Sequence, residues 1–132
     1  MNIIQKVKEL NLPDGSYVVE GSAVMDILGI RKARDIDLVV SKEVYTKLKQ
    51  DREWKEGFLH DTNFLAKDIY EIWLEWDSKD NEPNLEELLK DAHVIDGVPF
   101  VNIKRLLGWK KRRKLEKDLV DIKLIEEYLG DK

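Results

Sequence analysis

The chain has no cysteine among its 132 residues, which excludes a disulfide framework, a thiolate metal site and a cysteine nucleophile. Its two histidines, His60 and His93, stand far apart and at no metal-ligand or triad spacing, so we interpret both as structural or exposed. No apolar run approaches the ~20 residues of a membrane span. The first ten residues are amphipathic rather than typical of a signal sequence. We therefore expect a cytoplasmic protein without a membrane segment.

Prolines and glycines are also few, at three and seven, and no repeat or low-complexity linker divides the chain. We expect one domain over residues 1–132, with a C-terminal helical part over residues 103–130. Hydrophobic periodicity predicts an α/β (α+β) fold in which strands and helices follow one another, with two helices at the C-terminal end. The predicted strands cover residues 16–20, 35–40, 69–76 and a hairpin over 93–101 with a tight turn at Asp96-Gly97. The predicted helices cover residues 3–10, 23–28, 42–50, 103–114 and 116–129, and a further helix begins at Asn84. Ser41 and Asn84 are the predicted N-caps of their helices. Residues 51–67 carry no clear pattern.

Two acids stand out in the run Asp35-Ile36-Asp37-Leu38-Val39-Val40. Side chains alternate faces along a strand, so Asp35 and Asp37 project together from a strand whose other face is apolar. Two carboxylates this close repel each other unless a cation or a basic partner neutralises them. Mg²⁺ favours such hard oxygen ligands. The alternative is a surface strand with an exposed acidic face.

A Gly21-Ser22 pair lies between the strand predicted over residues 16–20 and the following helix. Glycine lets the backbone approach a ligand closely, and the N–H groups of a helix start with a serine hydroxyl can bind a phosphate. The alternative is a glycine turn followed by a serine N-cap, which is the commoner use of such a pair.

Together, Gly21-Ser22, the helix and Asp35-x-Asp37 resemble the signature of the nucleotidyltransferase superfamily, in particular its small bacterial and archaeal members. Such members often carry an arginine four residues before the first aspartate, and Arg31 occupies that position. They tend to have a serine or threonine where this chain has Ala33, and often a second glycine where it has Ser22.

A further match lies near the C-terminal end, where the family has a lysine, a Lys-Asp step and one more aspartate. Lys110, Lys117, Asp118 and Asp121 supply this spacing, whereas Lys114-Leu115 replaces the usual Gly-Arg. The resemblance runs from about residue 17 to residue 129.

The family takes a third acid from a later strand beside the Asp-x-Asp strand. Residues 69–76 are rich in aromatic and β-branched side chains and are the best candidate for that strand. Glu71 is our choice for the third carboxylate, and Asp68 and Glu75 are the rival ligands. Alternatively, Glu71 and Glu75 lie on the wet face of a sheet.

The resemblance implies a minimal nucleotidyltransferase fold, with a mixed β-sheet flanked by helices. It also implies Mg²⁺-dependent transfer of a nucleoside monophosphate from a nucleoside triphosphate to a hydroxyl acceptor. The acceptor classes are a small molecule, tRNA or other RNA, and a protein. The implied catalytic residues and metal ligands, for one or two Mg²⁺ ions, are Asp35, Asp37 and Glu71. The implied nucleotide contacts are Gly21, Ser22, Arg31, Lys110 and Lys117. The alternative is a catalytically inactive nucleotide- or partner-binding module, or a toxin–antitoxin component, acting as a homodimer or with a cognate partner chain.

Positive charge is concentrated in residues 104–117, which hold eight lysines or arginines and one acid, Glu116. This segment is +7 in a chain of net charge −4, which leaves −11 for the rest. A basic segment on an acidic body favours a polyanionic ligand such as a nucleotide or RNA. The alternative is a solvated helix face whose lysines pair with nearby acids. We interpret the four tryptophans, Trp54, Trp73, Trp76 and Trp109, as core or rim residues rather than base-stacking platforms.

Overall fold

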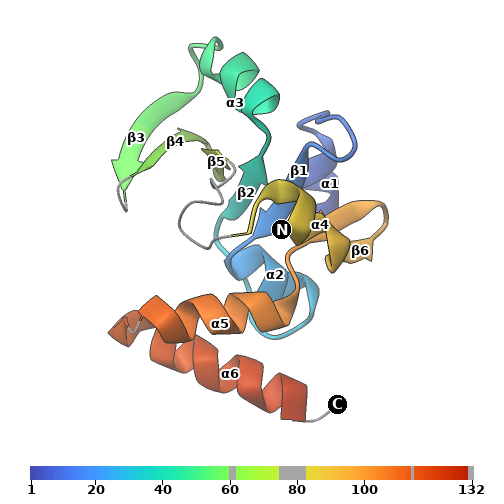
Figure 1. Ribbon diagram of the computed structural model, residues 1–132, viewed down its shortest axis with the longest axis vertical. Coiled ribbons are helices and arrows are strands. Elements are labelled where there is room, and N and C mark those ends of the chain that lie inside the picture. Colours follow the sequence, from blue (N-terminus) through green and yellow to red (C-terminus); the bar gives the residue numbers. More distant parts are fainter. Residues whose placement is uncertain (60–61, 75–82, 114, 131–132) are drawn as a thin grey trace.

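A computed structural model describes residues 1–59, 62–74, 83–113 and 115–130 (Figure 1). Within this part, seven strands form one mixed sheet in the order β3-β4-β5-β2-β1-β7-β6. β1 pairs with β7 and β2 pairs with β5 in parallel, and the other neighbours are antiparallel. The strands are β1 (Tyr17–Glu20), β2 (Ile36–Val40), β3 (Lys55–Leu59), β4 (Thr62–Lys67), β5 (Tyr70–Leu74), β6 (His93–Ile95) and β7 (Val98–Phe100). The predicted α+β class with a mixed sheet is confirmed.

The helices surround this sheet, and the last two lie side by side below it in Figure 1. They are α1 (Ile3–Lys8), α2 (Ser22–Ile27), α3 (Lys42–Lys49), α4 (Leu85–Lys90), α5 (Ile103–Arg113) and α6 (Leu119–Gly130), with a short 3₁₀ turn over Glu116–Asp118. Ser41 and Asn84 accept hydrogen bonds from the backbone N–H groups of Val44 and Glu87, so both act as N-caps. None of the helices in the described ranges is long and apolar enough to cross a membrane.

The centre of the sheet is buried on both faces. In β1 and β2 the apolar residues are fully or almost fully buried, and only Glu20 and Asp37 are intermediate. A strand covered on both sides reads as a continuous apolar run, and an acid in such a run marks a place where the cover opens. That place is where β1 and β2 meet the start of α2.

Residues 51–67, for which the sequence carried no clear pattern, contain the β3–β4 hairpin that widens the sheet beyond β5. The strand predicted over residues 69–76 is observed as β5, and its last two predicted residues, Glu75 and Trp76, lie outside the described residues. The turn at Asp96 and Gly97 is confirmed, with φ of +49° and +81° at the two positions. The last helix differs slightly from prediction, because its first residues form the 3₁₀ turn.

Candidate active site

Three carboxylates form a row across the centre of the sheet. Glu20 on β1 lies opposite Asp37 on β2, and Asp37 lies opposite Glu71 on β5. Residues in register on neighbouring strands point to the same face, so the three side chains lie together. Their spacing follows from strand pairing and not from proximity in sequence.

Asp35, Asp37 and Glu71 each offer a carboxylate oxygen within 4.8 Å of the others. The two neighbouring acids predicted from β2 are thus joined by the acid chosen from β5. Asp68, a rival for the third position, lies at φ +53° in the turn between β4 and β5 and is not part of this cluster. Glu75, the other rival, lies outside the described residues.

The electrostatics of this cluster are unfavourable without a cation. Burial raises the pKa of Asp37 to about 9, helped by the charge of Glu20, a hydrogen bond to Glu71 and the charges of Glu71 and Asp35. Burial also raises the pKa of Glu20 to about 7, partly offset by Arg113 and reinforced by Glu71. In addition, Oδ1 of Asp37 is buried and has no hydrogen-bond partner among the described residues. Hard oxygen donors at this spacing, one of them an unpaired buried oxygen, fit a divalent cation such as Mg²⁺.

Gly21 separates β1 from α2 and lies directly against the acids. Its backbone has φ +69° and ψ −148°, a conformation that only glycine adopts without strain. A β-carbon on Gly21 would lie 2.7 Å from Oδ2 of Asp37, so the absence of a side chain is a condition for the Asp37 position. Ser22 is the first residue of α2, and the N-cap position belongs to Gly21, which makes no side-chain cap bond. The alternative that the sequence left open, a serine N-cap at Ser22, is therefore not formed.

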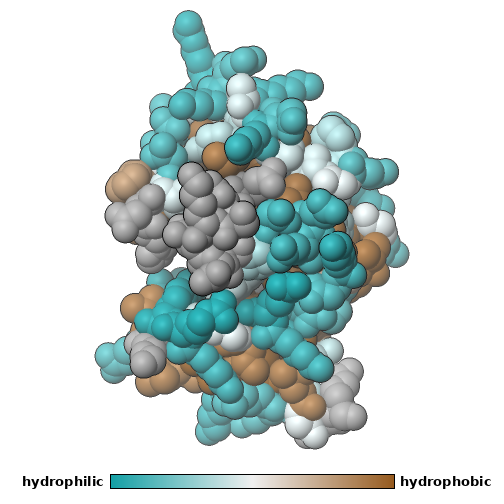
Figure 2. Space-filling model, in the orientation of Figure 1, coloured by the Kyte–Doolittle hydropathy of each residue, from teal (hydrophilic) through white to brown (hydrophobic). Residues whose placement is uncertain are grey.

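Glu20, Asp37 and Glu71 form one side of a cavity of about 670 Å³, which Gly21 and Ser22 also line and Asp35 does not. A basic wall of four residues faces them from α5 and the 3₁₀ turn: Lys110, Arg112, Arg113 and Lys117. On the face shown in Figure 2, hydrophilic residues gather over the C-terminal half of α5. Leu59, Thr62 and Trp73 line the cavity from β3, β4 and β5. Acidic, basic and apolar groups thus meet in one space.

Two of the expected nucleotide contacts are engaged in an ion-pair network at the rim of this cavity. Arg31 donates two hydrogen bonds to Asp121, of 2.7 Å from Nε and 2.9 Å from Nη2. Lys110, only 6% exposed, donates to Asp118 at 3.2 Å and to Asp121 at 3.1 Å. Arg113 donates to Asp118 at 2.8 Å. The network joins the loop after α2 to both C-terminal helices.

The network lowers the pKa of Asp121 and engages Arg31 and Lys110 in ion pairs. Burial by itself would raise the pKa of Asp121, but the hydrogen bonds from Arg31 and Lys110 outweigh it and lower that pKa. Arg31 contacts Asp121 rather than the strand acids. Arg112 and Lys117 make no ion pair with any described residue. Their charges face the cavity without an ion-pair partner in the described ranges.

Glu20 is the site residue that the sequence analysis missed. A glutamate that ends an apolar strand just before Gly-Ser was the available signal, because it has the same position at the end of β1 as Asp37 has at the start of β2. Its importance depends on the antiparallel register between these strands, which local patterns do not determine.

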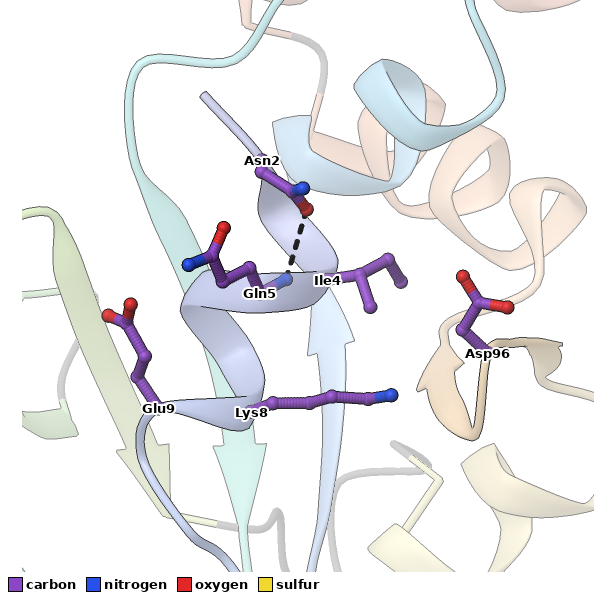
Figure 3. A pocket seen from close by; sticks show the side chains of 6 residues that line it. All are labelled: Asn2, Ile4, Gln5, Lys8, Glu9 and Asp96. Carbon is purple, nitrogen blue, oxygen red and sulfur yellow. Dashed lines mark hydrogen bonds between the residues drawn. The ribbon is translucent and has the colours of Figure 1, made fainter.

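The remaining candidates lie elsewhere. Nε2 of His93 accepts a hydrogen bond from the backbone N–H of Ile103, so His93 is structural, and His60 lies outside the described residues. A second, shallower cavity of about 480 Å³ lies between α1 and the β6–β7 turn. Figure 3 shows Ile4 and Lys8 pointing from α1 toward Asp96. This cavity shares no residue with the acidic site.

Comparison with known proteins gives one informative result. No protein-family model matches the chain, and no curated protein matches it. Among solved structures, it is similar to ANT(2")-Ia, an aminoglycoside nucleotidyltransferase crystallised with adenylyl-2"-tobramycin, with a TM-score of 0.59 and 18% identity. The similarity covers 98% of this chain and 86% of ANT(2")-Ia.

The chain has a nucleotidyltransferase-like fold. At this level of identity the similarity concerns the arrangement of helices and strands along nearly the whole chain. The acids and the glycine turn described above lie within this nucleotidyltransferase-like fold.

Proposed function

We propose that the protein is a Mg²⁺-dependent nucleotidyltransferase that transfers a nucleoside monophosphate from a nucleoside triphosphate to a hydroxyl acceptor. The observation that supports this most strongly is the clustering of the Asp35, Asp37 and Glu71 oxygens within 4.8 Å. Gly21 and Ser22 line the same cavity, and the fold is nucleotidyltransferase-like. Phosphoryl-transfer chemistry depends mainly on positioning and on charge neutralisation, and this cavity offers groups for both.

In this proposal, Asp35, Asp37 and Glu71 hold one or two Mg²⁺ ions. Bound Mg²⁺ would neutralise phosphate charge and make the acceptor hydroxyl more acidic. Glu71 is the acid on the far side of Asp37 from Gly21, so we assign to it the role of accepting the proton of the acceptor hydroxyl. Its carboxylate thus positions the acceptor and removes its proton.

The triphosphate would lie between Gly21 and Ser22 on one side and the basic wall on the other. Lys117 and Arg112 line this cavity, have no ion-pair partner in the part of the chain that the structure describes, and are suited to contact phosphate oxygens. Arg31 and Lys110 are not assigned a phosphate contact, because Asp121 pairs with both and Asp118 also pairs with Lys110. We assign to these two residues the role of holding α5 and its basic wall against the acids.

A second candidate function is a nucleotide- or partner-binding module without catalysis. The pairing of Arg31 and Lys110 with Asp118 and Asp121 favours it, because it removes two cations from the set available to stabilise a transition state. A toxin–antitoxin component, a homodimer and a complex with a cognate chain remain proposals of the same class. In the catalytic case, three acceptor classes stay open: a small molecule, an RNA end and a protein side chain. The tobramycin adduct in ANT(2")-Ia illustrates the first class for that protein.

The experiment that tests the proposal is isothermal titration of ATP, CTP, GTP and UTP with and without Mg²⁺. It compares the wild type, the Asp35→Asn/Asp37→Asn double variant and an Asp68→Asn control. We expect Mg²⁺-dependent binding in the wild type and the control, and none in the double variant. Binding that ignores Mg²⁺ and the double substitution would disprove the metal site. Binding without release of pyrophosphate in the presence of candidate acceptors would favour the non-catalytic module.

A further inference from the structure

We propose that Trp73 is the platform on which the acceptor stacks, and that the acceptor is a base-bearing nucleoside, either a free nucleotide or the end of an RNA strand. This inference rests on the proposed nucleotidyl transfer and specifies its second substrate. It also replaces our sequence interpretation of Trp73 as a core or rim residue by a binding role.

Trp73 lies two residues after Glu71 on β5, so both side chains project from the same face of the sheet. Phe64 is the residue opposite Trp73 on β4, and the two rings are stacked with their centroids 4.7 Å apart and an interplanar angle of 24°. Trp73 lines the large cavity and Phe64 does not. Phe64 therefore supports one side of the indole, while another side borders the space beside Glu71.

The support continues one strand further. Gly57 on β3 lies opposite Phe64, and a β-carbon at Gly57 would lie 2.5 Å from Cζ of the phenyl ring. The phenyl ring thus occupies the space that any other residue at position 57 would fill. A strand glycine of this kind marks a close approach by a neighbouring group. We call Gly57, Phe64 and Trp73 together the aromatic shelf, and its Trp73 end lies next to Glu71.

The direction of the reaction puts the acceptor on this shelf. In phosphoryl transfer the attacking and leaving oxygens lie roughly in line on opposite sides of the phosphorus. β2 lies between β1 and β5, so Asp37 separates Gly21, which follows β1, from Glu71 and Trp73 on β5. With the leaving pyrophosphate at Gly21 and Ser22, the attacking hydroxyl approaches from the side of Glu71 and the aromatic shelf.

The side of the cavity that carries Glu71 and the aromatic shelf favours an acceptor with a planar ring. The reacting hydroxyl would lie on a second ring attached to the planar one. Trp73 offers an indole surface, and Leu59 and Thr62 continue the lining toward the β3–β4 hairpin. Any of the nucleobases can stack on such an aromatic side chain, because each has a planar face. A base stacked on Trp73 places its ribose next to Glu71, where a ribose hydroxyl can give up its proton. The cavity therefore suits an acceptor that carries its hydroxyl on a sugar attached to a base.

The test uses the four tryptophans as reporters in protein labelled with 5-fluorotryptophan, whose fluorine signals are assigned by single Trp→Phe variants. Mg²⁺ and a non-hydrolysable ATP analogue are added first, to saturation. Four probes follow separately: AMP, a short single-stranded oligoribonucleotide with a free 3′ hydroxyl, tobramycin and a tyrosine-containing peptide. Trp109 lines the cavity from α5 and reports on the triphosphate, while the buried Trp54 is the internal control.

We expect the ATP analogue to move the Trp109 signal, and AMP or the oligoribonucleotide to move the Trp73 signal afterwards. A response to the oligoribonucleotide alone identifies an RNA end, and a response to AMP identifies a free nucleotide. In turnover assays, Trp73→Leu should raise KM for the base-bearing acceptor about tenfold, with little change in KM for the triphosphate. Trp73→Phe keeps a ring and should retain most of the affinity, which a purely structural role would not predict.

Four results would overturn the inference. A shift of the Trp73 fluorine signal on addition of the ATP analogue alone would mean that Trp73 stacks on the base of the donor nucleotide. A shift of the Trp73 signal by tobramycin or the peptide, with no shift by AMP or the oligoribonucleotide, would indicate a different acceptor class. No movement by any probe, with triphosphate binding intact, would reduce the aromatic shelf to packing and leave the proposed function standing. Loss of triphosphate binding itself would remove the proposed function and this inference together.

Discussion

Gly21 and Asp37 are in direct steric relation: the space that a side chain at residue 21 would need is occupied by the carboxylate of Asp37, 2.7 Å from where a β-carbon would lie. The glycine of the β1–α2 turn and the second acid of β2 are therefore one feature, and neither can change without the other. This relation gives the glycine a role in shaping the acidic site that is independent of any phosphate contact.

Substitution of Gly21 by alanine tests this relation. We expect Gly21→Ala to reduce Mg²⁺ affinity and turnover, because the new methyl group displaces the Asp37 carboxylate, and to cost about 2–3 kcal/mol of stability at this backbone conformation. Gly29→Ala is the matched control, since Gly29 has φ +77° and a β-carbon there meets no atom within 4 Å. It should cost only about 1 kcal/mol and leave Mg²⁺ affinity unchanged. Equal effects of both variants in urea unfolding and Mg²⁺ titration would argue against the contact.

The raised pKa of Asp37 predicts how Mg²⁺ and pH act together. The folded-state pKa of about 9 lies above the ordinary value of 3.8, so between these values the folded protein holds a proton that the unfolded chain has lost. The metal-free protein should thus lose stability as pH rises from about 4 through 9. Mg²⁺ competes with that proton, so its stabilising effect should be larger at pH 8 than at pH 6.

Thermal unfolding with Mg²⁺ or with EDTA, at both pH values, checks this. Asp37→Asn should remove the Mg²⁺ effect at either pH, whereas Asp68→Asn should behave as the wild type, because Asp68 lies outside the cluster and asparagine accepts its positive φ. A Mg²⁺ effect of the same size at pH 6 and pH 8 would contradict the assignment of a protonated Asp37.

Glu20→Gln should stabilise the metal-free protein. Glu20 is an acid whose pKa is raised to about 7 by burial, and its charge helps to raise the pKa of Asp37. Removing that charge ends the cost of burying it and its repulsion with Glu71 above pH 7, which stabilises the protein by on the order of 1–3 kcal/mol at pH 8. The measurement is urea unfolding in EDTA at pH 8. Glu9→Gln, at an exposed pair with Lys6, should change little. A Glu20→Gln variant less stable than the wild type would show that the repulsion is already relieved by another group.

The ion-pair network predicts a large difference between two aspartates. Asp121→Asn leaves Arg31 and Lys110 without their shared carboxylate and should cost about 3 kcal/mol. Asp91→Asn removes an exposed pair with Arg105 and should cost less than about 1 kcal/mol. Because the pKa of Asp121 is lowered, its stabilising effect is complete above about pH 4 and is lost as pH falls through the lowered value.

Denaturant unfolding of both variants at pH 7 and at pH 3 measures this difference. The difference in unfolding free energy between the wild type and Asp121→Asn should be smaller at pH 3 than at pH 7. The small effect of Asp91→Asn serves as the reference for an exposed pair. A gap that is small at pH 7 would mean that the two C-terminal helices are held to the sheet by apolar packing alone.

Local pattern in the sequence was sufficient for the elements that carry the acids. Period-two alternation placed Asp35 and Asp37 on a strand with an apolar back, and the same alternation selected Glu71 within β5. The Asp96-Gly97 turn and the N-caps at Ser41 and Asn84 depend on neighbouring residues only, and they too were predicted correctly. The β3–β4 hairpin escaped prediction, since β3 is an edge strand with mostly exposed side chains and carries little hydrophobic signal.

Tertiary structure alone decided which distant residues meet. Glu20 joined the acids through the register of β1 on β2, and Arg31 reached Asp121 across 90 residues of sequence. The aromatic shelf formed because a strand without local signal brought Gly57 beneath Phe64. The sequence by itself determined the strands that carry Asp37 and Glu71 and the turn at Asp96-Gly97, because these depend on side-chain alternation and turn residues within one segment. The contacts between segments depend on strand pairing and helix packing, which no single stretch of sequence encodes.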